Sequence, residues 1–145
     1  MNLTKEFIKS YICERQYFNL SVGGICDMQV TNEFCEVKPE KAKAIITALI
    51  KKIPIPQIIF LKKGSDYKIW SGQEIFYTIR EYMKGNLDTL LEKYEFYDFK
   101  YNEFEEGFKR FLKSIDVPVC IFEFKTENKE FKEEFFDIMN YLQQE

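Results

Sequence analysis

The sequence contains no histidine, and this absence removes several kinds of catalytic centre. Histidine supplies the imidazole of Ser-His and Cys-His nucleophile pairs and is a frequent metal ligand. Cysteine does not compensate, because Cys13, Cys26, Cys35 and Cys120 include no CxxC pair with the spacing typical of a zinc site. A site made of all four cysteines is the alternative. We expect no metal, and reduced, mostly buried thiols.

The chain also lacks a long apolar run and an excess of positive charge. No segment approaches the length of a membrane span, and the stretch Met1–Glu6 is not an apolar signal. Lysine and arginine number 21 against 24 acidic residues, which gives a formal net charge of -3. The sequence therefore predicts a soluble, cytoplasmic protein without membrane contact. Nucleic-acid binding would need a local basic patch, and the overall charge does not favour it.

The chain is rich in apolar and aromatic residues, enough to form one hydrophobic core. With 145 residues, 46% of them apolar and 17% aromatic, it is too apolar to be disordered and has the size of one domain. Periodicity predicts helices over 3–12, 39–52, 73–84, 102–115 and 128–143, and strands over 57–61, 67–70 and 117–124. Residues 17–30 are expected to be extended, with Gly23 and Gly24 as a hairpin turn. The sequence thus predicts a single mixed α/β (α+β) domain over 1–145, a small sheet packed with several helices.

The segment around Gly72 has a layout used to hold phosphate. Two short strands are followed by Gly72 and Gln73 at the start of a helix, where backbone N–H groups can bind an anion. The plainer interpretation is a simple connection between strand and helix.

Three segments carry a resemblance to a known family. Leu49–Pro56 (LIKKIPIP), Ile69–Tyr82 (IWSGQEIFYTIREY) and Phe135–Asn140 (FFDIMN) are similar, in this order, to motifs of the N-terminal domain of GmrSD type IV restriction enzymes. The resemblance implies a ParB/sulfiredoxin-like fold and a site that binds and hydrolyses nucleotide in support of DNA cleavage. It places that site at Ser71, Gly72, Gln73, Glu74 and Asn140. Many family members continue into a nuclease domain, which we do not expect in this chain.

The departures from the family motifs remove the charged groups of that site. Ser71 stands where the family has aspartate, Glu74 replaces a glutamine, and Ile75 and Ile138 replace arginines. Each charge-assisted hydrogen bond to phosphate contributes about 1.5–3 kcal/mol, against about 8 kcal/mol for a micromolar ligand. We therefore expect a vestigial nucleotide site closed by apolar packing, with no bound cofactor and no nucleotide hydrolysis.

Other residues have competing interpretations. Asn140 is either a polar group on a helix face or a ligand contact, and Asp137 is either a partner of a lysine or a catalytic acid. The pairs Lys51-Lys52 and Lys62-Lys63 fit ordinary solvated charge. The aromatic positions of one run fit either a half-buried strand or a surface for a protein partner: Tyr94, Phe96, Tyr97, Phe99 and Tyr101.

These observations favour a non-catalytic protein that binds another macromolecule, with a protein as the expected partner. The resemblance implies a setting in conflict between phage and host, as an inhibitor or regulator of a nuclease defence system. The alternative is an NTP-binding, DNA-specificity subunit of a restriction system whose nuclease is a separate chain. That alternative needs cations from elsewhere in the chain, such as Arg80 or Arg15.

Overall fold

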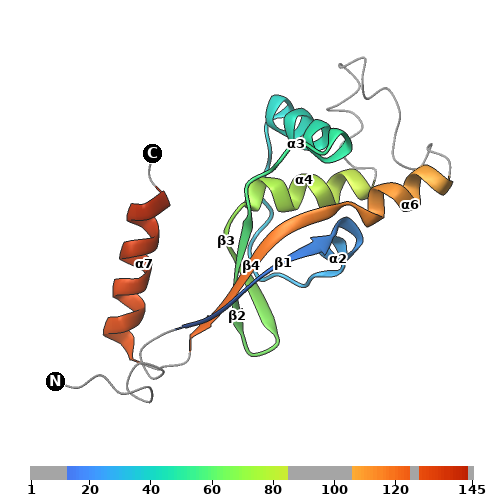
Figure 1. Ribbon diagram of the computed structural model, residues 1–145. Helices are drawn as coiled ribbons and strands as arrows, with labels where there is room; N and C mark the ends of the chain where they lie inside the picture. The colour runs from blue at the N-terminus through green and yellow to red at the C-terminus, as the bar shows by residue number, and fades with distance from the viewer. Residues whose placement is uncertain (1–12, 85–105, 125–127, 144–145) are drawn as a thin grey trace.

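The computed structural model describes residues 13–84, 106–124 and 128–143 (Figure 1). Within these ranges a four-stranded mixed sheet is packed with five helices. The mixed α/β class predicted from the sequence is therefore confirmed. None of the helices in the described ranges has the combination of length and apolar composition needed to cross a membrane.

The sheet joins strands from distant parts of the chain in the order β1-β4-β2-β3. β1 (Cys13–Ser21) runs antiparallel to β4 (Asp116–Phe124) along its whole length. β2 (Ile58–Lys63) lies parallel to β4 on the other side, and β3 (Asp66–Ser71) returns antiparallel to β2. The outer strands are consequently β1 and β3.

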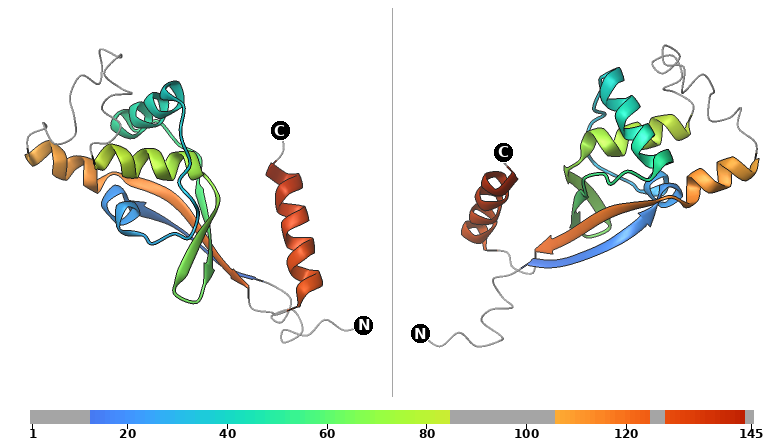
Figure 2. Two further views of the ribbon diagram at one scale, coloured as in Figure 1. Left: turned by 180° about the vertical axis from the view of Figure 1, so that it is seen from behind. Right: turned by 45° about the horizontal axis from the view of Figure 1, so that its top comes forward.

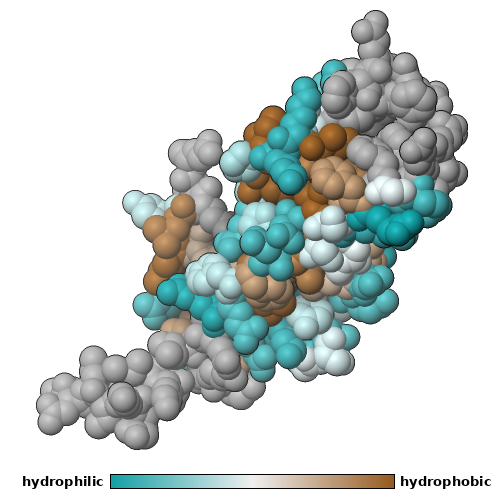
Figure 3. Space-filling view, turned by 45° about the vertical axis from the view of Figure 1, so that its right-hand side comes forward, coloured by the Kyte–Doolittle hydropathy of each residue, from teal (hydrophilic) through white to brown (hydrophobic). Residues whose placement is uncertain are grey.

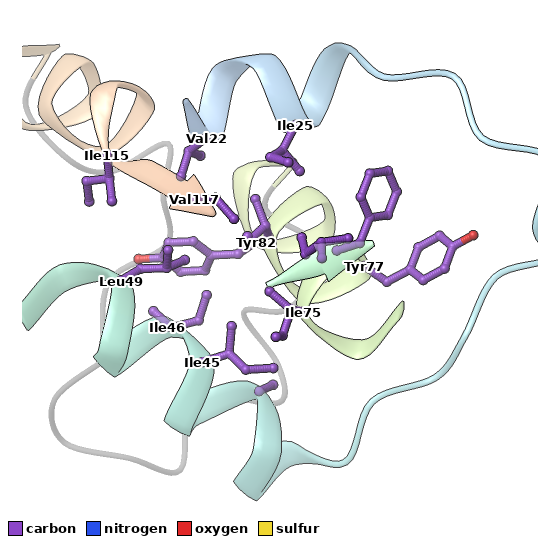
Figure 4. Close-up of a cluster of buried hydrophobic side chains, with 14 of the residues drawn as sticks. Val22, Ile25, Ile45, Ile46, Leu49, Ile75, Tyr77, Tyr82, Ile115 and Val117 are labelled. Atoms are coloured by element: carbon purple, nitrogen blue, oxygen red, sulfur yellow. The ribbon is translucent and has the colours of Figure 1, made fainter. Parts of the chain in front are cut away.

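The main core lies on one face of this sheet, under α2 (Val22–Asp27), α3 (Pro39–Lys51) and α4 (Gln73–Met83). α3 begins with Pro39, whose fixed φ suits the first helical turn. Its buried residues recur at helical spacing: Ala42, Ile45, Ile46, Ala48 and Leu49. Of these, Ile45, Ile46 and Leu49 point toward α4 (Figure 4). α6 (Glu106–Ser114) leads directly into β4 and contributes Leu112 to the same core.

The opposite face is covered by α7 (Lys129–Gln143), which Figures 1 and 2 show across the sheet from α3 and α4. Side chains alternate along a strand, so Phe122 and Phe124 of β4 point away from the core residues Val117 and Val119. Both phenylalanines contact Phe135 of α7, with ring centroids 4.9 and 5.0 Å apart. This second layer is built from rings, whereas the main core is mostly aliphatic.

The outer edge of β3 is closed by the segment that follows α2. Val30 forms a parallel bridge with Tyr67, and the Asn32 side chain takes the place of a neighbouring strand. The Asn32 Oδ1 accepts a 2.6 Å hydrogen bond from the Ile69 N–H, and its Nδ2 donates to the Ile69 carbonyl at 3.1 Å. One amide therefore satisfies both backbone groups of that residue.

Most of the predicted elements in the described ranges are confirmed in kind and within a few residues. This holds for α3, for the strands β2, β3 and β4, and for the helices α4 and α7. α6 begins at Glu106, inside the range predicted for it. The helix predicted over 3–12 lies outside the described residues.

The hairpin turn predicted at Gly23 and Gly24 is wrong, because both glycines lie inside α2. The Ser21 hydroxyl accepts a 3.0 Å hydrogen bond from the Gly24 N–H, which caps the helix. Val22 and Ile25, three positions apart, are buried on one side of it. The strand before the glycines therefore pairs with β4 rather than with the residues that follow.

Candidate functional site

The site begins where β3 ends and α4 starts. Gly72 has φ of 92°, a left-handed conformation that side chains with a Cβ rarely adopt. A Cβ at this position would lie 3.1 Å from the Ile58 Cα, so the turn passes tightly over β2. The Phe76 N–H then donates to the Gly72 carbonyl at 3.0 Å, which opens the helix. Glycine is required here both for backbone conformation and for space.

The first turn of α4 has no side-chain cap. Gly72 occupies the N-cap position, and no side chain in the described residues bonds to the N–H groups of that turn. These groups carry the positive end of the helix dipole. The exposed Glu74 lies in the same turn and supplies a negative charge next to them.

A hollow of about 650 Å³ adjoins this turn. One wall comes from α3, through Ala44, Ile45 and Ala48, and another from the segment Pro54–Pro56. Residues from Trp70 to Ile75 complete it. Most of the lining is therefore apolar, and the space is large enough for a small ligand or for a side chain of a partner.

The charged groups around the hollow are few. Among the described residues that line it, Lys41 is the one cation and Glu74 the one anion. Neither arginine considered as a replacement lies there. The Arg80 guanidinium sits 5.3 Å from the centre of the Phe76 ring, and that of Arg15 sits 5.5 Å from the Tyr17 ring on β1.

The structure brings together four of the five predicted site residues. Ser71, Gly72, Gln73 and Glu74 all line the hollow. Asn140 does not: it is exposed on α7 and is not part of the lining. Asn140 is therefore not part of the site, although Phe136 of the same α7 motif contacts Trp70, which lines the hollow.

The expectation that apolar packing closes this site is wrong. Ile75 is buried in the main core with 6% of its surface exposed, as an apolar replacement for arginine would be. Ile138 is 48% exposed and lies on α7, so it fills no space next to Gly72. The hollow next to Gly72 is therefore lined by Ile75 and filled by neither isoleucine.

The lining residues that the sequence motifs did not assign to the site include Cys35, Lys41 and Trp70. Lys41 follows Pro39 on the first turn of α3, and no local pattern separates it from the other lysines of that helix. Trp70 directly precedes Ser71, and its ring stacks on Phe136 of α7 with centroids 4.6 Å apart. The position of Trp70 inside the motif segment Ile69–Tyr82 was the available signal. The aromatic run Tyr94–Tyr101 lies outside the described residues.

The pKa values of two groups near the core, Cys26 and Tyr77, differ from their ordinary values. Burial is the main cause that raises the pKa of the Cys26 thiol, while the nearby Arg80 acts in the opposite direction. Burial likewise raises the pKa of Tyr77. Neither residue lines the hollow. Cys26, Cys35 and Cys120 form no disulfide, and no group of three potential ligands in the described part of the chain is placed to hold a metal.

The lysine pairs do not form one basic surface. Lys51 and Lys52 lie at the end of α3, and Lys62 and Lys63 lie at the tip of the β2–β3 hairpin. Figures 1 and 2 show these two places at opposite ends of the sheet and helix layers. The arrangement gives no continuous track for a nucleic-acid backbone among these four residues.

No family model, curated protein or solved structure matches this chain. The likeness to the GmrSD family therefore rests on the sequence motifs.

Proposed function

We propose that this protein acts by binding another protein and does not catalyse a reaction. The observation that carries the proposal is the lining of the hollow at Gly72, where Lys41 is the one cation among the described residues. A single charge-assisted contact contributes about 1.5–3 kcal/mol, well below the roughly 8 kcal/mol of a micromolar ligand. Glu74 adds repulsion for a polyphosphate in the same turn.

The surface offers apolar residues for contact with a protein. Phe34, Ile53 and Tyr141 are 62%, 51% and 75% exposed. Figure 3 shows apolar residues reaching the surface in several separate places on one face of the molecule. Large apolar and aromatic side chains of this kind supply the centres of protein interfaces. The resemblance adds the setting, in which the partner is a nuclease defence system that this protein inhibits or regulates.

The proposal predicts that the purified protein neither binds nor hydrolyses nucleotide. Isothermal titration with ATP and GTP in the presence of Mg²⁺ should give no binding heat, and a phosphate-release assay should show no turnover. Phosphate release that a Gln73→Ala change abolishes would contradict the proposal, because Gln73 lines the hollow. Capture of a defence nuclease from a cell lysate, followed by a direct binding measurement with that purified nuclease, would support it.

A second function is favoured by the open hollow at the uncapped start of α4. In this alternative the chain is an NTP-binding, DNA-specificity subunit whose nuclease is a separate protein. Lys41 would then replace the missing arginines. Titration would show nucleotide binding that Lys41→Ala weakens about tenfold, the loss of one charge-assisted contact. Lys63→Ala on the exposed hairpin is the matched control and should leave that binding unchanged.

A further inference from the structure

No strand in the described ranges pairs with the outer edge of β1. β1 pairs with β4 from Cys13↔Phe124 to Ser21↔Asp116 without a bulge, and no described strand lies on its other side. Figure 2 shows β1 at the margin of the sheet in the right-hand view. Residues 15–19 are all exposed, including Tyr17 at 59% and Phe18 at 39%. The edge therefore presents a row of backbone donors and acceptors with two large rings.

None of the usual devices that protect an edge strand is found in this stretch. In natural sheets, proline, lysine, bulges, inward-pointing charges or a covering segment prevent an edge strand from pairing with another chain. Residues 15–19 contain no proline, glycine or lysine, and the pairing with β4 is regular. The one charge, on Arg15, lies beside the Tyr17 ring. The β3 edge, in contrast, is covered by Val30 and Asn32.

We propose that β1 pairs antiparallel with β1 of a second copy of this chain, about a two-fold axis at Tyr17. Tyr17 is the midpoint of both the strand and its exposed stretch, so this register pairs the most residues. Arg15 then faces Asn19 of the other copy and no like charges are opposed. The two tyrosines meet across the axis as a directly opposed aromatic pair, which is favourable in antiparallel sheets.

The edge is self-complementary in this register, as a symmetric dimer requires. The two sheets become one of eight strands, and the open edges of both copies disappear. This inference is independent of the proposed function, because neither the hollow nor a foreign partner enters it.

The first test measures mass against concentration by sedimentation or light scattering. The unaltered protein should shift from monomer to dimer as its concentration is raised. Tyr17→Lys places two cations opposite each other and removes the ring pair, so the dissociation constant should rise about tenfold. Tyr141→Lys is the matched control, an exposed tyrosine on α7, and should leave the dimer unchanged.

A charge-swap experiment tests the axis itself. Tyr17→Lys and Tyr17→Glu should each associate more weakly alone than the unaltered protein, and an equal mixture should associate more tightly than either variant because opposite charges then meet. An unaltered protein that stays monomeric at millimolar concentration would overturn the proposal. So would a dimer insensitive to Tyr17→Lys, or a mixture that does not associate although both variants keep the circular dichroism of the parent. None of these outcomes bears on nucleotide binding or nuclease capture, so the proposed function stands or falls separately.

Discussion

The two outer strands of the sheet are held in different ways. β3 has β2 on one side and the Asn32 amide on the other, and it ends in the tight turn at Gly72. β1 has β4 on one side, and its other side is exposed from residue 15 to residue 19. A side chain can thus close an edge as a strand does, by offering one donor and one acceptor at the spacing of a peptide group. β1 has no such neighbour in the described residues, which is why we place a second copy there.

The largest effect is expected at the end of the closed strand. Gly72→Ala forces a residue with a Cβ into a left-handed conformation and places that Cβ against Ile58. The free energy of unfolding should therefore fall by about 2–4 kcal/mol. Urea denaturation measures this difference. Gly64→Ala is the matched control, since Gly64 also has a positive φ but its added Cβ would meet nothing within 4 Å. It should cost only about 1 kcal/mol, and equal losses for the two variants would show that crowding over β2 is unimportant.

The next effect comes from opening the closed edge. Asn32→Ala removes the hydrogen bonds to both backbone groups of Ile69, and we expect a loss of about 2 kcal/mol in the free energy of unfolding. Denaturant titration measures it, and hydrogen exchange at the Ile69 amide should accelerate. Asn19→Ala, in the exposed part of the open strand, serves as the comparison and should stay within about 0.5 kcal/mol. If the two variants lost the same stability, the contrast between the edges would be unfounded.

The smallest effect concerns the tyrosine that supports Asn32 from α4. The Tyr77 hydroxyl donates to the Asn32 carbonyl at 3.1 Å, so Tyr77→Phe should cost about 1 kcal/mol at neutral pH. The exposed Tyr141→Phe should cost nothing measurable.

The same tyrosine predicts a pH dependence. Its folded-state pKa is raised by burial, so the neutral form favours folding, and this contribution is present below the ordinary tyrosine pKa near 10. It is lost as the pH rises through the folded-state pKa. The difference in stability between the parent and Tyr77→Phe should therefore shrink in strongly alkaline solution. A difference that grows with alkalinity would contradict the assignment.

Local signals predicted most elements because they act over short stretches. Pro39 and the spaced aliphatic residues after it are sufficient to predict α3, and the prolines at 54 and 56 mark its end. Gly23 and Gly24 were misread because two glycines fit a hairpin, while the Ser21 cap that starts a helix there uses a common residue. The role of Asn32 has no local signal, since it depends on a strand that lies 37 positions further along the chain.

The part of the candidate site that is contiguous in sequence was predicted, because local signals reach only over short stretches. Ser71 to Glu74 lie next to one another in sequence and reach the hollow together. Lys41 joins them only because α3 packs beside the turn. Asn140 does not join them, because it is exposed on α7 while the phenylalanines of that helix pack against β4 and Trp70. Motif order along the chain does not determine which face of a sheet a helix covers.

The local chemistry of this protein follows from its residues and their order: the lack of histidine catalysis, the helices and strands with strong periodicity, and a turn at Gly72 that follows a strand and opens a helix. The tertiary structure sets the rest: among the described residues, β1 has no partner on its outer side, β3 is covered on its outer side, and one lysine lines the hollow at the Gly72 turn. The physical reason is that an edge or a hollow is a relation between segments far apart in the chain. Residues 13–21 become an outer strand only through pairing with residues 116–124.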